Sequence, residues 1–109
     1  MAYDERLAAS LKELIKNRRD FHTQKMFGGI GFLLRGNMCF GLYKEYLILR
    51  LGGPQAQKAL ARSGTKPFDI TGRAMKGWVM VAPAGMKTKQ SLRNWVGQAI
   101  DFVSTLPRK

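Results

Sequence analysis

Four short β-rich segments separated by turn residues constrain the fold of this chain more than any other feature. They span 24–27, 30–35, 38–43 and 46–51. Gly36 and Asn37 supply the positive-φ residues that a two-residue hairpin needs. Lys44 and Glu45 mark a second tight turn less strongly. Because strands joined by tight turns pair as antiparallel neighbours, we expect a β-meander whose strand order follows the chain.

Both faces of this meander are expected to be apolar. Two-residue turns would place Arg35 opposite Met38 and Tyr43 opposite Tyr46, and the faces follow by alternation. One face then carries Ile30, Phe32, Leu34, Cys39, Tyr43, Tyr46 and Ile48, and the other takes Leu33, Phe40, Leu42, Leu47 and Leu49. A sheet covered on one side alternates apolar and polar residues, so helices on both sides or a partner subunit must cover the second face. A β-bulge would shift this register.

Helices are expected before and after the strands, where apolar residues recur at helical spacing. The remaining elements are a first helix over 4–17, a short second helix over 54–64, a loop through Lys66 and Pro67, a last strand over 77–81 and a closing helix over 89–106. Asp4 and Thr88 are the expected caps of the first and last helices. The sequence therefore predicts an α+β fold, in which N-terminal, middle and C-terminal helices pack on an antiparallel meander sheet of about five strands.

The chain is strongly basic. Its 19 lysines and arginines against 7 acidic residues leave a net charge of +12, and such an excess attracts polyanions. Nucleic acid is the partner that this charge favours first, with an acidic protein or an anionic membrane surface behind it. The alternative is an ordinary solvated surface, because the basic residues are scattered and no run of about five or six occurs.

Length and cysteine content limit the class of protein. With 109 residues, the chain is long enough for one core, and we expect a single domain over 1–109. No apolar stretch approaches the roughly 18 residues of a membrane span, so we expect no membrane partner. The single cysteine, Cys39, cannot form an internal disulfide and fits a reducing compartment, so we expect the protein in the cytoplasm.

The side chains that ordinary catalysis needs are scarce. The chain has one histidine, His22, and nothing in the spacing brings it to Cys39 as a base and nucleophile. One His and one Cys cannot complete a zinc site, and the glycine-rich segment 28–31 lacks the lysine and the following helix of a phosphate-binding loop. We therefore expect no metal, no cofactor and no enzyme activity. The alternative is an uncharacterised enzyme built around Cys39, His22 and Asp69.

Two basic clusters are candidate contacts for nucleic acid or a protein partner. The first lies at the end of the first helix and comprises Lys12, Lys16, Arg18 and Arg19. The second lies at the start of the closing helix and comprises Lys87, Lys89 and Arg93. Either cluster could contact phosphates, or could be solvated charge at a helix end. The aromatic residues that could stack on bases, Phe27, Phe32, Phe40 and Trp78, fall in apolar segments and are expected in the core.

Four ordered sequence blocks carry a family resemblance. They are KMFGGIGF at 25–32, GNMCFG at 36–41, PFDITGR at 67–73 and MKGWV at 75–79. With the opening MAYDE and the closing TLP, the chain resembles, along essentially its whole length, the N-terminal domain of the TfoX (Sxy) regulators of competence.

This resemblance implies an antiparallel sheet with packed helices, of the kind seen in secretion-chaperone-like domains. It also implies a link to transcriptional control, because full-length members promote expression of DNA-uptake genes together with a cyclic-AMP-responsive activator. It implies no catalytic or cofactor residues. The chain departs from the full-length regulators in ending after this domain and in being more basic, so a stand-alone copy could have another partner.

Polar residues inside the family blocks have no assigned role. They are Lys25, Asp69, Arg73 and Lys76, and they form either a buried ion-pair network or a surface site. The sequence as a whole predicts a non-enzymatic regulatory binding module, linked to transcriptional regulation through contacts with a transcription-related protein or nucleic acid. The alternative is a chaperone-like or structural homodimer that uses the second apolar face and has no nucleic-acid role.

Overall fold

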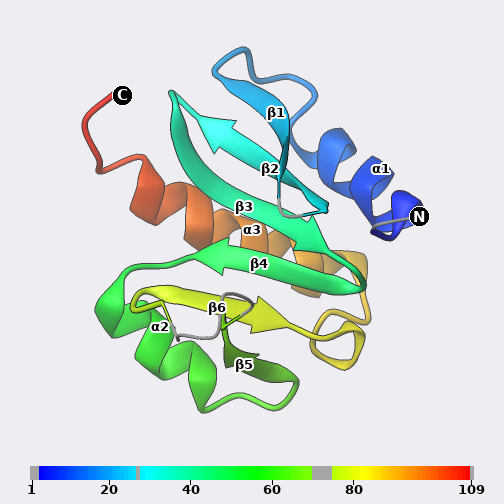
Figure 1. The fold of residues 1–109 in the computed structure, drawn as a ribbon, viewed down its shortest axis with the longest axis vertical. Helices are drawn as coiled ribbons and strands as arrows, with labels where there is room; N and C mark the ends of the chain where they lie inside the picture. Colours follow the sequence, from blue (N-terminus) through cyan, green and yellow to red (C-terminus); the bar gives the residue numbers. More distant parts are fainter. Residues whose placement is uncertain (1–2, 27, 70–74, 109) are drawn as a thin grey trace.

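In a computed structural model, which describes residues 3–26, 28–69 and 75–108, the chain forms a six-stranded antiparallel sheet with three α-helices (Figure 1). The strands are β1 (Phe21–Met26), β2 (Gly29–Leu34), β3 (Asn37–Tyr43), β4 (Tyr46–Arg50), β5 (Thr65–Pro67) and β6 (Trp78–Val81). Their order in the sheet is β1-β2-β3-β4-β6-β5. The predicted α+β fold and the predicted meander order of the first four strands are confirmed.

Strand β5 is the one strand that the sequence did not predict. It occupies the expected loop through Lys66 and Pro67 and pairs with β6, with Lys66 opposite Met80. With 3 residues it is too short to show the two-residue period of a strand. The hydroxyl of Thr65 also donates to the carbonyl oxygen of Ala59 at 2.7 Å, which joins this edge strand to the end of the preceding helix.

The helices are α1 (Glu5–Leu14), α2 (Gly53–Leu60) and α3 (Lys89–Val103), and a short 3-10 turn covers Pro83–Gly85. Both predicted caps are confirmed. The Asp4 carboxylate accepts from two backbone amides of the first turn of α1, and the Thr88 hydroxyl accepts from the amide of Ser91 at the start of α3. No helix in the described ranges is long and apolar enough to cross a membrane.

The main core lies between the sheet and the helices. Helix α3 passes behind β3 and β4 in Figure 1 and places the buried Trp95 against the sheet, while α1 contributes Leu11. The buried residues of α2, Ala56 and Ala59, belong to the same core. A second, smaller cluster lies on the other face of the sheet and contains no residue from these helices. The apolar part of the second face is therefore covered by Phe68, and helices on both sides of the sheet, one of the two predicted coverings, are not found among the described residues.

The first hairpin turn lies one residue earlier than predicted. Leu34 pairs with Asn37, and the turn consists of Arg35 and Gly36, whose φ angles are 53° and 86°. Two consecutive positive φ angles are typical of a type I′ hairpin turn. Asn37 is therefore a strand residue, and its buried side-chain amide donates to the carbonyl oxygen of Pro107 at 2.9 Å.

A register shift in the β2–β3 pair corrects the predicted faces. The shift falls after Phe32, which pairs with Phe40 and stacks on its ring at 4.7 Å between centroids. A bulge lets two successive residues point the same way, and here both Cys39 and Phe40 belong to the main core. The helix-facing side therefore takes most of both predicted sets. Its members are Ile30, Phe32, Leu34, Cys39, Phe40, Leu42, Leu47 and Leu49.

Candidate functional site

The sheet face turned away from α1 and α3, which we call the outer face, has an apolar centre ringed by aromatic side chains. Ile48 of β4 and Met80 of β6 are paired and buried, and Phe68 covers them. Tyr43 and Tyr46 are paired at one end of this cluster, and Trp78 lies at the other. The three rings are only half-buried, so each presents part of its surface to solvent.

A cation lies over each of these half-buried rings. The Lys44 ammonium is 5.4 Å from the centre of the Tyr43 ring, and the Lys66 ammonium is 4.4 Å from that of Tyr46. The guanidinium carbon of Arg50 is 5.5 Å from the centre of the Trp78 ring. All three distances are within the roughly 6 Å range of a cation–π contact. The outer face therefore combines positive charge and aromatic surface at three places.

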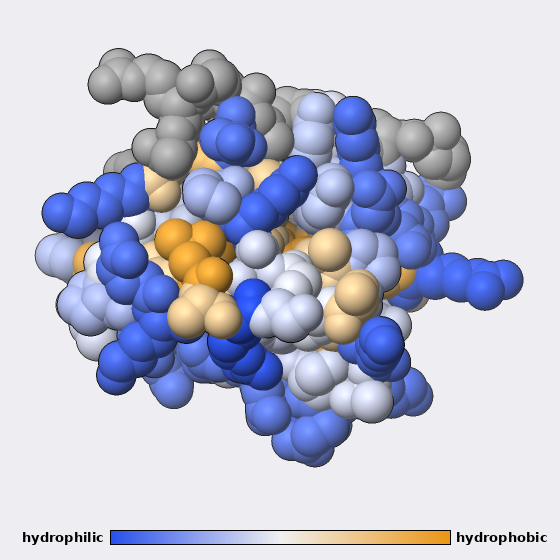
Figure 2. Space-filling view, turned by 90° about the horizontal axis from the view of Figure 1, so that it is seen from below, coloured by the Kyte–Doolittle hydropathy of each residue, from blue (hydrophilic) through white to orange (hydrophobic). Residues whose placement is uncertain are grey.

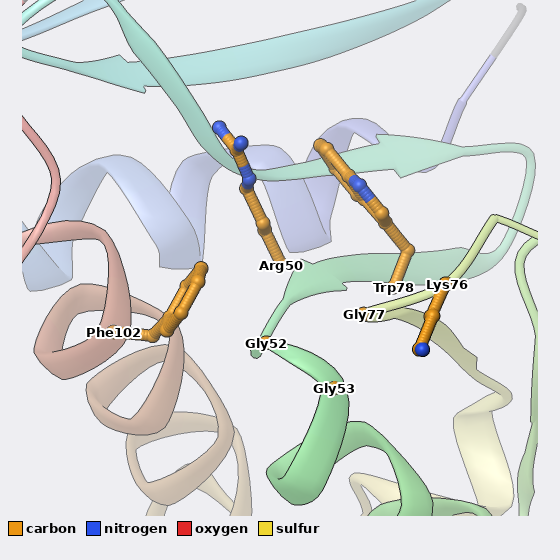
Figure 3. Close-up of a pocket in the computed structure, with 7 residues that line it drawn as sticks. All are labelled: Arg50, Gly52, Gly53, Lys76, Gly77, Trp78 and Phe102. Carbon is orange, nitrogen blue, oxygen red and sulfur yellow. The ribbon is translucent and has the colours of Figure 1, made fainter.

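A pocket opens at the Trp78 end of the outer face (Figure 3). Its volume is about 290 Å³, and it is lined by Arg50, Gly52, Gly53, Lys76, Gly77, Trp78 and Phe102. Arg50 and Trp78 project to the same side from neighbouring strands, and Phe102 reaches in from α3. Arg50 and Trp78 therefore lie together on one side of the cavity, while the Lys76 side chain lines its rim and points away from them.

Gly52 is required where the pocket meets α3. A Cβ atom at this position would lie 2.6 Å from the Phe102 ring, and the φ angle of Gly52 is 83°. Gly52 also caps α2 and has no side chain with which to accept from the first amides of that helix. These amides carry the positive end of the helix dipole, which adds to the charge of Arg50 and Lys76 in favouring an anion.

The predicted cluster at the end of the first helix is exposed, but part of its charge is paired within the chain. Lys16 forms an ion pair with Glu13 of the same helix. Arg18 donates two hydrogen bonds to Asp20, at 3.1 and 3.0 Å. These hydrogen bonds raise the pKa of Arg18 and lower the pKa of Asp20. In the described part of the chain, Lys12 and Arg19 form no ion pair.

The predicted cluster at the start of α3 borders a separate groove. Lys89 and Arg93 line a cavity of about 460 Å³ between α1 and α3, whereas Lys87 does not. On the α1 side the lining is Ala9, Ser10, Glu13 and Leu14, so none of Lys12, Lys16, Arg18 and Arg19 borders the groove. The side-chain hydroxyls of Thr88 and Ser91 accept hydrogen bonds from one another's backbone amides and so satisfy part of the N-terminus of α3.

The polar residues of the family blocks lie at the surface wherever they are described. Lys25 on β1, Asp69 after β5 and Lys76 before β6 are all exposed. Arg73 lies outside the described residues. Lys25, Asp69 and Lys76 take part in none of the ion pairs found among the described residues. Of the two predicted alternatives, these three residues therefore fit a surface location and not a buried ion-pair network. Of the three, Lys76 lines the pocket.

Cys39 and His22 do not have the environment of a catalytic pair. Cys39 has no exposed surface, and burial raises the pKa of its thiol to about 12. His22 is exposed on the edge strand β1, opposite Leu33. Reactive cysteines are partly exposed and have a lowered pKa, so Cys39 lacks the properties of a nucleophile. Within the described residues, no group of three or more His, Cys, Asp or Glu could hold a metal ion.

Three of the cations at this site, Lys44, Arg50 and Lys66, were not predicted as site residues from the sequence. Trp78 was expected in the core with the other aromatic residues, whereas the structure leaves that ring half-buried. Phe32 and Phe40 are core residues as predicted, and Phe27 lies outside the described residues. One sequence signal was available. Tyr46, Ile48 and Arg50 alternate along one strand, so they share a face that has both aromatic and basic character.

Comparison of the sequence with known protein families finds a match to one family model. The sequence model of the family described as the TfoX N-terminal domain matches residues 13–103. No curated protein and no solved structure gives a significant match.

Proposed function

This chain belongs to the TfoX N-terminal domain family, and on that premise we propose that it is a non-enzymatic regulatory module that binds nucleic acid through the outer face of its sheet. The family suggests a regulatory or competence-related role and is not a known enzyme family. The buried, protonated Cys39 and the exposed His22 support the non-enzymatic part of the proposal.

The observation that carries the proposal is the pairing of cations with half-buried aromatic rings on one open face. Nucleic acids present phosphates, which Lys and Arg neutralise, and bases, which stack on aromatic side chains. An exposed cation–π contact is worth about 0.5–1 kcal/mol, whereas stacking of a base on an aromatic side chain is worth about 1–3 kcal/mol. A base can therefore replace the cation over a ring, and the released cation can contact a phosphate.

Charge across the whole chain supports the same partner. The net charge of +12 attracts polyanions and speeds their encounter with the protein. The helical clusters add to this field, but the Lys16 and Arg18 pairs reduce what the first cluster offers. We propose the outer face as the principal surface. Nucleic-acid contacts at the helical clusters stay a prediction for Lys12, Arg19, Lys87, Lys89 and Arg93.

Charge reversal at matched positions tests this proposal. Lys66→Glu with Lys76→Glu alters the outer face, and Lys12→Glu with Arg19→Glu alters the end of α1. All four side chains are exposed, and each pair takes the net charge from +12 to +8, because each reversal removes two charges. Affinity for a labelled oligonucleotide is measured over a range of salt concentrations. We expect the outer-face pair to bind more weakly and to lower the slope of log affinity against log salt by about 2.

Equal losses in the two double variants would mean that affinity depends on net charge alone, and the outer face would lose its special role. A larger loss in the α1 variant would move the interface to the helices. If the unaltered protein binds no nucleic acid at low salt, the proposed function is wrong.

A homodimer through the outer face is the second candidate. The apolar cluster there is a reason for it, but Lys44, Arg50 and Lys66 surround that cluster and would be brought close to their copies, where like charges repel. Met75 is the only large apolar side chain in the described ranges that is exposed rather than buried or half-buried. Figure 2, which views the molecule from below, shows a small central apolar area surrounded by hydrophilic side chains. Sedimentation at high protein concentration distinguishes the two, because the nucleic-acid proposal expects a monomer.

A further inference from the structure

We infer that the pocket beside Arg50 and Trp78 holds one nucleotide of a single-stranded nucleic acid, with its base on Trp78 and its phosphate at the Arg50 guanidinium. This inference rests on the proposed function and adds to it the form of the nucleic acid and the position that reads a base.

The pocket is small. Its volume of about 290 Å³ lies just below the roughly 300 Å³ at which the range for small-ligand sites begins, so it has room for one small group such as a single base. Glycines form the side of the pocket where the chain enters α2, and a larger residue at Gly52 would clash with Phe102. The glycines therefore leave the space open, and the longer side chains of the other lining residues enclose it.

The walls suit the two parts of a nucleotide. Trp78 and Phe102 offer aromatic surfaces on different sides of the cavity, and Arg50 lies next to Trp78 (Figure 3). The tilted contact of Trp78 with Phe68, at 5.5 Å between ring centres, holds the indole in place on one side. The surface that Arg50 covers is the one that a base would take. The guanidinium of Arg50 would then contact the phosphate, while the Lys76 ammonium at the rim would contact a neighbouring phosphate of the strand.

The arrangement favours a single strand over a duplex. In a duplex the faces of the bases are covered by their neighbours, so aromatic side chains on a flat sheet gain contact only with unstacked bases. A second ring is available along the sheet. Tyr46 and Arg50 lie four residues apart on β4, which is roughly 13 Å at about 3.3 Å per residue. An extended strand that crosses from Tyr46 toward Trp78 would meet both rings.

Binding of a deoxythymidine oligomer of about ten residues, and of a duplex of the same length, tests the inference. We expect the single strand to bind more tightly and to quench the fluorescence of Trp78. The variant Trp78→Leu keeps an apolar side chain against Phe68 but removes the stacking surface. It should lose about 5- to 100-fold in affinity for the single strand, with little change for the duplex, and the quench should disappear. The remaining tryptophan, Trp95, is buried and serves as the internal control.

Lys76→Gln gives a second variant that does not disturb packing, because Lys76 is exposed. It should reduce the salt slope for the single strand by about 1. If both variants bind the single strand as the unaltered protein does, the pocket assignment is wrong, while salt-dependent binding through Lys66 would leave the proposed function standing. Equal affinity for duplex and single strand also overturns the inference. Absence of any nucleic-acid binding at low salt overturns both.

Discussion

At the scale of single residues, Cys39 shows how burial decides chemistry. The side chain has no exposed surface, and burial raises the pKa of its thiol to about 12. An unfolded cysteine ionises near pH 8.5. Between these values the folded chain holds a proton that the unfolded chain releases, so the free energy of unfolding falls as pH rises above about 8.5.

Replacement of Cys39 by alanine should remove this pH dependence. We expect the unaltered protein to lose about 1 kcal/mol more stability than Cys39→Ala between pH 7.5 and 9.5, measured by urea unfolding of both proteins at each pH. Because the free energy of unfolding is compared between two pH values in the same protein, the stability lost by replacing the side chain with a smaller one cancels. Identical pH dependence in the two proteins would show that the thiol ionises freely in the folded state.

At the scale of secondary-structure elements, the start of α3 could be predicted from its capping residue, Thr88. Thr88 accepts from the amide of Ser91 at 3.0 Å, and the Ser91 hydroxyl accepts from the amide of Thr88 at 3.1 Å. This reciprocal arrangement satisfies backbone donors that the helix cannot pair itself. Because α3 carries Phe102 to the pocket and Trp95 to the core, its start affects both.

Thr88→Ala should lower the free energy of unfolding by about 1 kcal/mol. Ser104→Ala at the other end of α3 is the control. The Ser104 side chain is exposed and forms no hydrogen bond with a described residue, so its loss should change stability by less than about 0.5 kcal/mol. Denaturant unfolding of the three proteins measures the difference. An equal effect of both substitutions would mean that the cap contributes nothing particular to the helix.

The elements were predictable from sequence where the signal is local. The caps Asp4 and Thr88, the helical stripes and the pairing of Tyr43 with Tyr46 follow from spacing and residue type. The register of β3 could not be predicted in this way. The positive φ angle expected at Asn37 is adopted by Arg35 instead, and a bulge shifts the pairing of β3 with β2. In the observed register, the buried Asn37 side chain contacts the distant Pro107, and no short-range pattern shows that contact.

At the scale of the whole molecule, charge and shape act together. The sequence predicted a polyanion partner from the net charge of +12 but placed the contacts at helix ends, where basic residues are adjacent in sequence. The outer face brings together residues from β4, β6 and the segments around them, such as Arg50, Lys66 and Lys76. Long-range strand pairing creates that juxtaposition, so composition could suggest the partner but not the surface.

Backbone amide shifts, mapped by nuclear magnetic resonance during titration with the single-stranded oligomer, test whether nucleic acid binds to the outer face. We expect the largest shifts in β4 and β6 and at Lys66 and Lys76, with smaller effects across the helices. Shifts confined to 12–19 and 87–93 would place the interface on the helical clusters and contradict the account, as would a spectrum that the oligomer leaves unchanged.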